Sequence, residues 1–260
     1  MQSIESLLRR DFWISLGTLI LIIVMTWAWL VTGAGMDMTA LEMTRMDPAM
    51  AMPAAVWNRD YAVLIFFMWW IMMIAMMLPS AAPVILLGAA LNRRTSPEHS
   101  PYGSSSCFLT GYLLAWAVFS AVAVMGQWLL QTNGLLTGFL HLNSQSMAGV
   151  LLIGAALWQL TPVKQACLRH CRSPVDFLIQ RRRPGTTGAL RMGAEHGIYC
   201  LGCCWFLMLL LFVGGVMNLY WIAALALYVL AEKLLSTGRS ISYVAAGLLA
   251  CTGIYLLLNA

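Results

Sequence analysis

Charged side chains are scarce in this sequence. Asp, Glu, Lys and Arg together make up 10% of the 260 residues, whereas hydrophobic residues make up 61%. A water-soluble protein carries about 25% charged residues, because its surface must interact with water. The composition therefore excludes an ordinary soluble domain and predicts a membrane protein that crosses the lipid bilayer several times.

Recognisable enzyme motifs are also missing. The sequence has no glycine-rich phosphate loop followed by lysine, no serine in a nucleophile elbow and no cluster of His, Asp and Glu within an apolar run. The net charge of +5 comes from short basic loops between apolar runs, not from a basic domain. We therefore assign no catalytic residue and expect no nucleic-acid partner.

The long apolar segments predict an all-α transmembrane bundle that forms a single domain over residues 1–260. We expect seven spans, at residues 12–31, 61–91, 107–131, 146–171, 193–217, 219–235 and 241–258. Pro79 and Pro83 lie in the second span, which we expect to be broken or strongly bent. The small-residue pairs Gly111/Ala115 and Gly193/Gly197 predict closely packed helices.

The distribution of basic residues predicts the orientation of the bundle. If the N-terminus is cytoplasmic, all but Arg45 and Arg59 of the 15 Lys and Arg residues lie in cytoplasmic segments. Cytoplasmic loops are enriched in Lys and Arg. We therefore predict a protein of the bacterial inner membrane with a periplasmic C-terminus, a methionine-rich periplasmic loop at 33–60 and a basic cytoplasmic loop at 162–192.

Two groups of cysteines suggest a metal site. Cys200, Cys203 and Cys204 follow His196 in the stretch HGIYCLGCC, and Cys167 and Cys171 are spaced four residues apart upstream. On a helix, residues at i, i+4 and i+7 share one face, as do residues at i and i+4. Because the cytoplasm keeps thiols reduced, clustered cysteines there favour metal binding or redox chemistry over structural disulfides.

The predicted ligands come from both groups, and the predicted metal is Cu(I) or Zn(II), since thiolates suit both ions. The ligand candidates are Cys167, Cys171, Cys200 and Cys203, with Cys204 or His196 able to replace one of them. Glu195, Glu232 and His170 are candidates to hold the ligands by hydrogen bonds. Two alternatives remain open: the cysteines are small packing residues, and Glu232 is an interfacial charge.

Methionine is abundant, with 18 residues, and predicts a route for a soft metal. A thioether binds Cu(I) and needs no deprotonation. The candidates are Met36, Met38, Met43, Met46, Met50 and Met52 in the periplasmic loop, and Met68, Met72 and Met76 along the second span. The alternative is that these flexible side chains fill gaps between helices, as methionine often does.

Several of these motifs occur together in a known family. The sequence resembles a bacterial family of predicted metal-binding integral membrane proteins of unknown function. The resemblance rests on the stretches 73–79, 158–164, 167–174, 196–205 and 231–233. It implies a multi-pass membrane protein with a metal site, but it implies neither a substrate nor a reaction.

From these observations we expect a membrane protein that handles a soft metal, with copper favoured, in transport, in delivery or in the assembly of a metalloprotein. Its partners would be the lipid bilayer and either a metallochaperone or a larger membrane complex. One alternative is a subunit of such a complex in which a structural zinc holds the basic loop. A lesser alternative is a membrane thiol oxidoreductase, suggested by the spacing of Cys200 and Cys203 but disfavoured by their predicted cytoplasmic location.

Overall fold

The computed structural model describes residues 4–36, 38–45, 56–95, 102–137, 140–181, 183 and 185–260. In this part of the chain the fold is all-helical, and no strand is present. The helices are α1 (Ile4–Val31), α2 (Ala40–Arg45), α3 (Arg59–Thr95), α4 (Tyr102–Thr132), α5 (Gln145–Leu160), α6 (Pro162–Arg172), α7 (Pro174–Gln180), α8 (Gly185–Leu209), α9 (Leu211–Gly214), α10 (Leu219–Leu234) and α11 (Gly238–Leu258).

Five long apolar segments could each cross a membrane, which supports a multi-pass membrane protein. They are α1, α3, α4, α8 with α9, and α11. Helices α5 and α6 meet at a bend of 65° and add a sixth if the pair counts as one span. The remaining predicted span, at 219–235, corresponds to α10, whose 16 residues extend about 24 Å, less than the hydrocarbon core of a bilayer. The count of seven and the orientation remain predictions.

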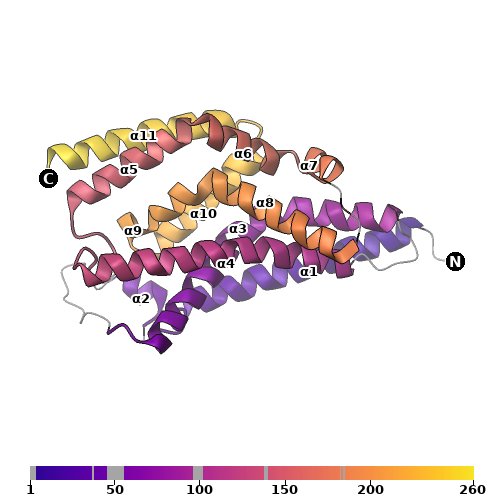
Figure 1. The fold of residues 1–260 in the computed structure, drawn as a ribbon, viewed down its shortest axis with the longest axis horizontal. Coiled ribbons are helices and arrows are strands. Elements are labelled where there is room, and N and C mark those ends of the chain that lie inside the picture. The colour runs from indigo at the N-terminus through magenta and orange to yellow at the C-terminus, as the bar shows by residue number, and fades with distance from the viewer. Residues whose placement is uncertain are drawn as a thin grey trace.

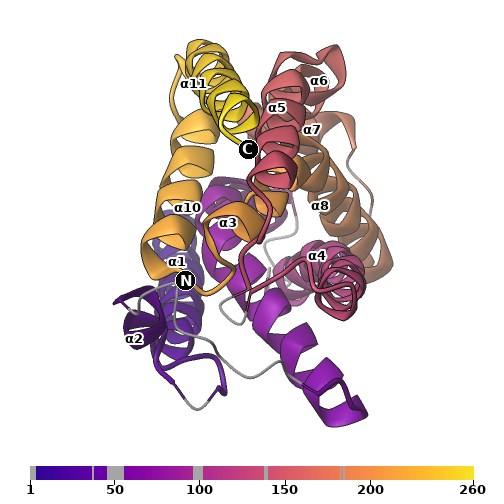
Figure 2. The ribbon, with the colours of Figure 1, turned by 90° about the vertical axis from the view of Figure 1, so that its left-hand side faces the viewer.

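Helix α3 lies at the centre of the bundle. It contacts α1, α4, α7 and α10, and Figure 2 shows it between these neighbours. Over its most apolar window, 56% of α3 is buried, compared with 11% for α1 and 17% for α11. The outer helices expose large apolar side chains such as Leu21 and Leu248. Such exposure fits a surface that faces lipid.

The helices run largely along one long axis (Figure 1). Helix α1 begins at one end of this axis and α11 ends at the other, while α5 and α11 form a pair along one side. Helices α4 and α8 approach closely where glycine leaves room for the other backbone. A Cβ atom added at Gly111 would overlap the backbone oxygen of Leu190, and one added at Gly193 would overlap that of Phe108. The predicted close packing at these small residues is confirmed.

Helix α3 is not broken at its prolines, and a side chain of a neighbouring helix satisfies one carbonyl that they free. The expected strong bend stays a prediction. Pro79 has no N–H to donate to the carbonyl of Ala75, and Trp27 donates its indole N–H to that oxygen instead, at 3.1 Å. A neighbouring helix thus satisfies the carbonyl that the proline leaves without a partner, as the membrane interior requires. Helix α3 therefore continues from Arg59 to Thr95 through both prolines.

Candidate metal centre

The two cysteine groups lie on helices that pack against each other. Helix α8 buries Cys200, Cys203 and Cys204, each at most 1% exposed. Helix α6 is N-capped by Thr161, whose hydroxyl oxygen accepts the backbone N–H of Lys164, and Pro162 occupies its first turn. These features start a new helix just after the bend and direct it along α8. The bend thereby brings Cys171 to the cysteines of α8.

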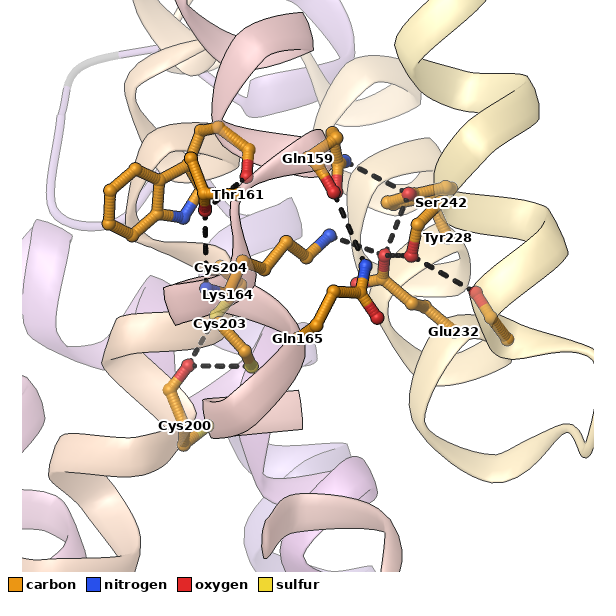
Figure 3. A network of polar contacts seen from close by, with 12 residues as sticks. Gln159, Thr161, Lys164, Gln165, Cys200, Cys203, Cys204, Tyr228, Glu232 and Ser242 are labelled. Atoms are coloured by element: carbon orange, nitrogen blue, oxygen red, sulfur yellow. Dashed lines mark hydrogen bonds and ion pairs between the residues drawn. The ribbon is translucent and has the colours of Figure 1, made fainter. Parts of the chain in front are cut away.

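Four thiols come together between these helices. The Cys171 side chain approaches those of Cys200 and Cys203 from α6, and the Cys204 side chain lies beside them on α8. The thiols of Cys203 and Cys204 also donate to the backbone oxygen of Cys200, at 3.0 and 2.9 Å (Figure 3). All seven cysteines of the chain are free thiols. We call Cys171, Cys200, Cys203 and Cys204 the thiol cluster.

Polar groups from three other helices surround the thiol cluster. Lys233 of α10 donates to the sulfur of Cys200 at 2.9 Å and to the hydroxyl of Ser80 on α3 at 3.1 Å. The Tyr112 hydroxyl of α4 lies 3.1 Å from the same sulfur. Lys233 is only 4% exposed. A buried ammonium group beside sulfur offers an electrostatic partner for a thiolate, which is the form that binds metal.

Two of the predicted ligands lie beside the thiol cluster rather than in it. Cys167 is half-buried and packs against the backbone of Gly202, where an added Cβ would lie 2.7 Å from its sulfur. The His196 ring is buried among the rings of Phe108, Tyr112 and Phe177, and its Nδ1 has no hydrogen-bond partner. Aromatic residues of α4 and α7 therefore enclose the His196 ring.

The residues predicted to support the ligands have other partners. Glu195 pairs with Arg183 at 2.9 Å and with Arg191 at 3.5 Å. The His170 ring stacks on Tyr199, with ring centroids 4.2 Å apart, and its Nδ1 lies 2.9 Å from the carbonyl oxygen of Ala166. Of these contacts, the stacking of His170 on Tyr199 joins α6 to α8.

Glu232 belongs to a separate buried network. It forms an ion pair with Lys164 of α6, and both side chains are fully buried. The same carboxylate oxygen accepts the hydroxyls of Tyr228, at 3.0 Å, and of Ser242 on α11. Gln159 donates to the Tyr228 hydroxyl at 2.9 Å. Figure 3 shows this network beside the cysteines of α8.

Four buried residues were not among the predicted site residues: Met77, Tyr112 and Lys233 around the cluster, and Lys164 in the network around Glu232. Lys164 and Lys233 interrupt or border apolar runs, and an ionisable residue at such a position is expected to have a function or a partner. Tyr112 and Met77 give no comparable signal in the sequence, since both residue types are common in apolar helices.

The methionine candidates fall into three groups. Met68, Met72 and Met76 are fully buried on α3. Met36, Met38 and Met43 are half-buried near α2. The remaining three, Met46, Met50 and Met52, lie outside the described residues.

The thiol cluster is not arranged as a finished coordination shell. In the described part of the chain, no three His, Cys, Asp or Glu side chains have the geometry to hold a metal ion. The thiols of Cys203 and Cys204 instead donate to the backbone oxygen of Cys200. Because metal binding to cysteine requires loss of the thiol protons, the cluster would rearrange over short distances when it binds an ion.

A comparison with protein families identifies the chain further. A family model described as PpoB2, copper chaperone, matches residues 66–256. The chain belongs to this PpoB2 family. No curated protein and no solved structure matches the chain.

The PpoB2 match contains the main features described above. It includes all four members of the thiol cluster, Lys233 and the network around Glu232, and it begins after the loop that holds Met36, Met38 and Met43. Its description agrees with the expected copper-handling role and gives no support to zinc. Four thiols and a nearby thioether form a set of soft donors, which fits Cu(I) as the ion handled.

Proposed function

We propose that this member of the PpoB2 family is a copper chaperone of the bacterial inner membrane that binds Cu(I) at its thiol cluster and delivers it to a client protein. Copper is the cargo in this proposal. The observation that carries it is the packing of α6 against α8, which buries Cys171 with the three buried cysteines of α8 and brings it to Cys200 and Cys203. The family description supports copper as the metal.

The chemistry of the cluster favours Cu(I) over harder ions. Cysteine and methionine sulfur are the soft ligands that select Cu(I), whereas carboxylates and carbonyls suit Mg²⁺ and Ca²⁺. On α10 the carboxylate of Glu232 comes directly before Lys233. It already forms an ion pair with Lys164 and accepts hydrogen bonds from Tyr228 and Ser242. Sulfur atoms, with the imidazole of His196 beside them, are therefore the donors available to a cation in this part of the protein.

The position of the cluster favours delivery. Cys200 lies 15 residues after the start of α8, about 22 Å along the helix. Cargo held at this depth is protected from water and from thiol competitors. We propose that the thioethers of Met68, Met72 and Met76 connect the cluster with the side predicted to be periplasmic, where the loop methionines would exchange copper with a partner.

The test is a Cu(I) titration of the purified protein in detergent, in competition with a chromogenic chelator. Wild-type protein is expected to retain Cu(I) stoichiometrically, and the variant Cys200→Ser/Cys203→Ser is expected to lose it. The matched control is Cys251→Ser, because Cys251 is exposed on α11, away from the cluster. Equal copper retention by the double variant and the control would refute the proposed binding site.

A further inference from the structure

A fifth sulfur atom lies against the thiol cluster. The Met77 Sδ on α3 is 3.8 Å from the Cys204 Sγ, and both residues are fully buried. Met77 is one of several buried methionines of α3, and this contact with a cysteine sets it apart from the row at Met68, Met72 and Met76. From this contact we propose that Met77 is a ligand of the bound copper and gives the site its selectivity for Cu(I) over Zn(II). The inference rests on the proposed function, because it names a residue of the same site.

The separation of the two sulfurs suits a shared metal ion. A metal–sulfur bond of about 2.3 Å and a tetrahedral angle of about 109° place two sulfur ligands about 3.8 Å apart. The distance between Met77 Sδ and Cys204 Sγ has this value. In the metal-free protein the Cys204 thiol, which donates to the Cys200 carbonyl oxygen at 2.9 Å, lies against the Met77 thioether across this gap. When Cu(I) binds, the thiol proton leaves to solvent and the ion takes its place between the two sulfurs.

The backbone at Met77 is fixed by groups that also contact the cluster. The Met77 carbonyl accepts the Ser80 hydroxyl at 2.8 Å and the Tyr112 hydroxyl at 3.2 Å. Tyr112 also contacts the Cys200 sulfur, and Ser80 accepts from Lys233. The position of Met77 on α3 is therefore coupled to the position of Cys200 on α8. Such support from neighbouring groups is what holds ligands in place at metal sites.

The thioether provides selectivity because of its chemistry. It is neutral, has no proton to lose and is a soft donor, which suits Cu(I). The ligands that zinc uses in proteins are cysteine, histidine and carboxylate. A cluster that binds its ion partly through Met77 therefore gains affinity for Cu(I) and gains little for Zn(II).

The direct test replaces methionine by selenomethionine and records X-ray absorption at the copper edge. Copper-loaded protein is expected to show a selenium neighbour in addition to sulfur. The variant Met77→Leu should lose the selenium signal and keep the sulfur signal. The matched control is Met217→Leu, which changes a methionine of similar burial between α9 and α10, 13 residues beyond Cys204 and outside the proposed methionine route. A wild-type copper shell that contains sulfur but no selenium would overturn the role of Met77 and leave the thiol cluster standing, whereas failure to bind copper would overturn both proposals.

A second measurement separates ligation from packing. The affinity of Met77→Leu for Cu(I) should fall at least about tenfold, because even the loss of a group that only supports a metal ligand lowers affinity by about that factor. Its affinity for Zn(II) should be unchanged. Met217→Leu should keep both affinities. An equal loss of affinity for both metals in Met77→Leu would assign Met77 a packing role only and refute the inference.

Discussion

Two adjacent residues of α10 enter two different buried sites. Glu232 faces α6 and α11, where Lys164, Tyr228 and Ser242 surround one of its oxygens. Lys233 faces α3 and α8, where it contacts Ser80 and Cys200. Glu232 thus has an ion-pair partner. Among the described residues, Lys233 forms no ion pair with any carboxylate.

The difference separates a structural site from a candidate functional one. A buried ion pair whose members are also hydrogen-bonded holds its helices in one arrangement. A buried ammonium group that has only a hydroxyl and a thiol as neighbours lacks a negative partner, and a cysteine thiolate would supply one. An ionisable group at membrane depth is expected to have a function or a partner. Glu232 has its partner in Lys164, so Lys233 is the better candidate for a functional role.

Removing the structural partner should have the largest effect. Lys164→Met leaves the Glu232 carboxylate buried without its cation, and breaking one side of such a pair costs about 3 kcal/mol or more. We expect a large decrease in thermal stability and in the yield of folded protein, measured by helicity and by detergent size-exclusion chromatography.

Two variants keep this prediction falsifiable. Lys164→Met/Glu232→Gln removes both charges and should recover part of the lost stability. Glu195→Gln removes a partly exposed pair with Arg183 and should change stability by about 1 kcal/mol at most, as exposed pairs do. If Lys164→Met is no less stable than Glu195→Gln, the Lys164–Glu232 pair is not a structural element.

Removing Lys233 should act on copper rather than on the fold. Lys233→Met deletes a buried charge without leaving a carboxylate unpaired, so helicity and thermal stability should be close to those of the wild type. The thiolate form of the cluster loses its nearest cation, and Cu(I) affinity should fall about tenfold, at the low end of what lost neighbouring groups cost at metal sites. Competition titration measures this loss, and unchanged affinity would assign Lys233 no role in metal binding.

The helices and the buried face of α8 were predictable from local pattern. Long apolar runs require helices in a membrane, and residues at i, i+4 and i+7 share a helix face whatever surrounds them. For this reason the burial of His196, Cys200 and Cys203 follows the expectation. The same pattern cannot tell which members of a face meet a second helix. That choice depends on the crossing of α6 and α8, and it brings Cys204 into the cluster while His196 remains among aromatic rings.

The parts that could not be predicted are contacts between distant segments. Lys164 and Glu232 are 68 residues apart, and nothing in either local stretch specifies the other. The proline in α3 gives a second example. A missing backbone donor at Pro79 predicts a break, but the indole of Trp27, 48 residues before Ala75, satisfies the free carbonyl. Tertiary partners of this kind override local signals and leave no periodic pattern in the sequence.

The smallest expected effect is that of Cys167→Ser. The two cysteines of α6 allow the same comparison, between a residue of the thiol cluster and a neighbour outside it, within one helix. Cys171 is buried and interacts with Cys200 and Cys203, whereas Cys167 is half-buried against the backbone of Gly202. Cys171→Ser should therefore lose Cu(I) in the competition titration. Cys167→Ser keeps the four thiols of the cluster, so its affinity should stay within about twofold of the wild type, the range of a substitution that breaks no key contact. The reverse order of effects would mean that Cys167, and not Cys171, completes the site, and that α6 rotates about its axis when copper binds.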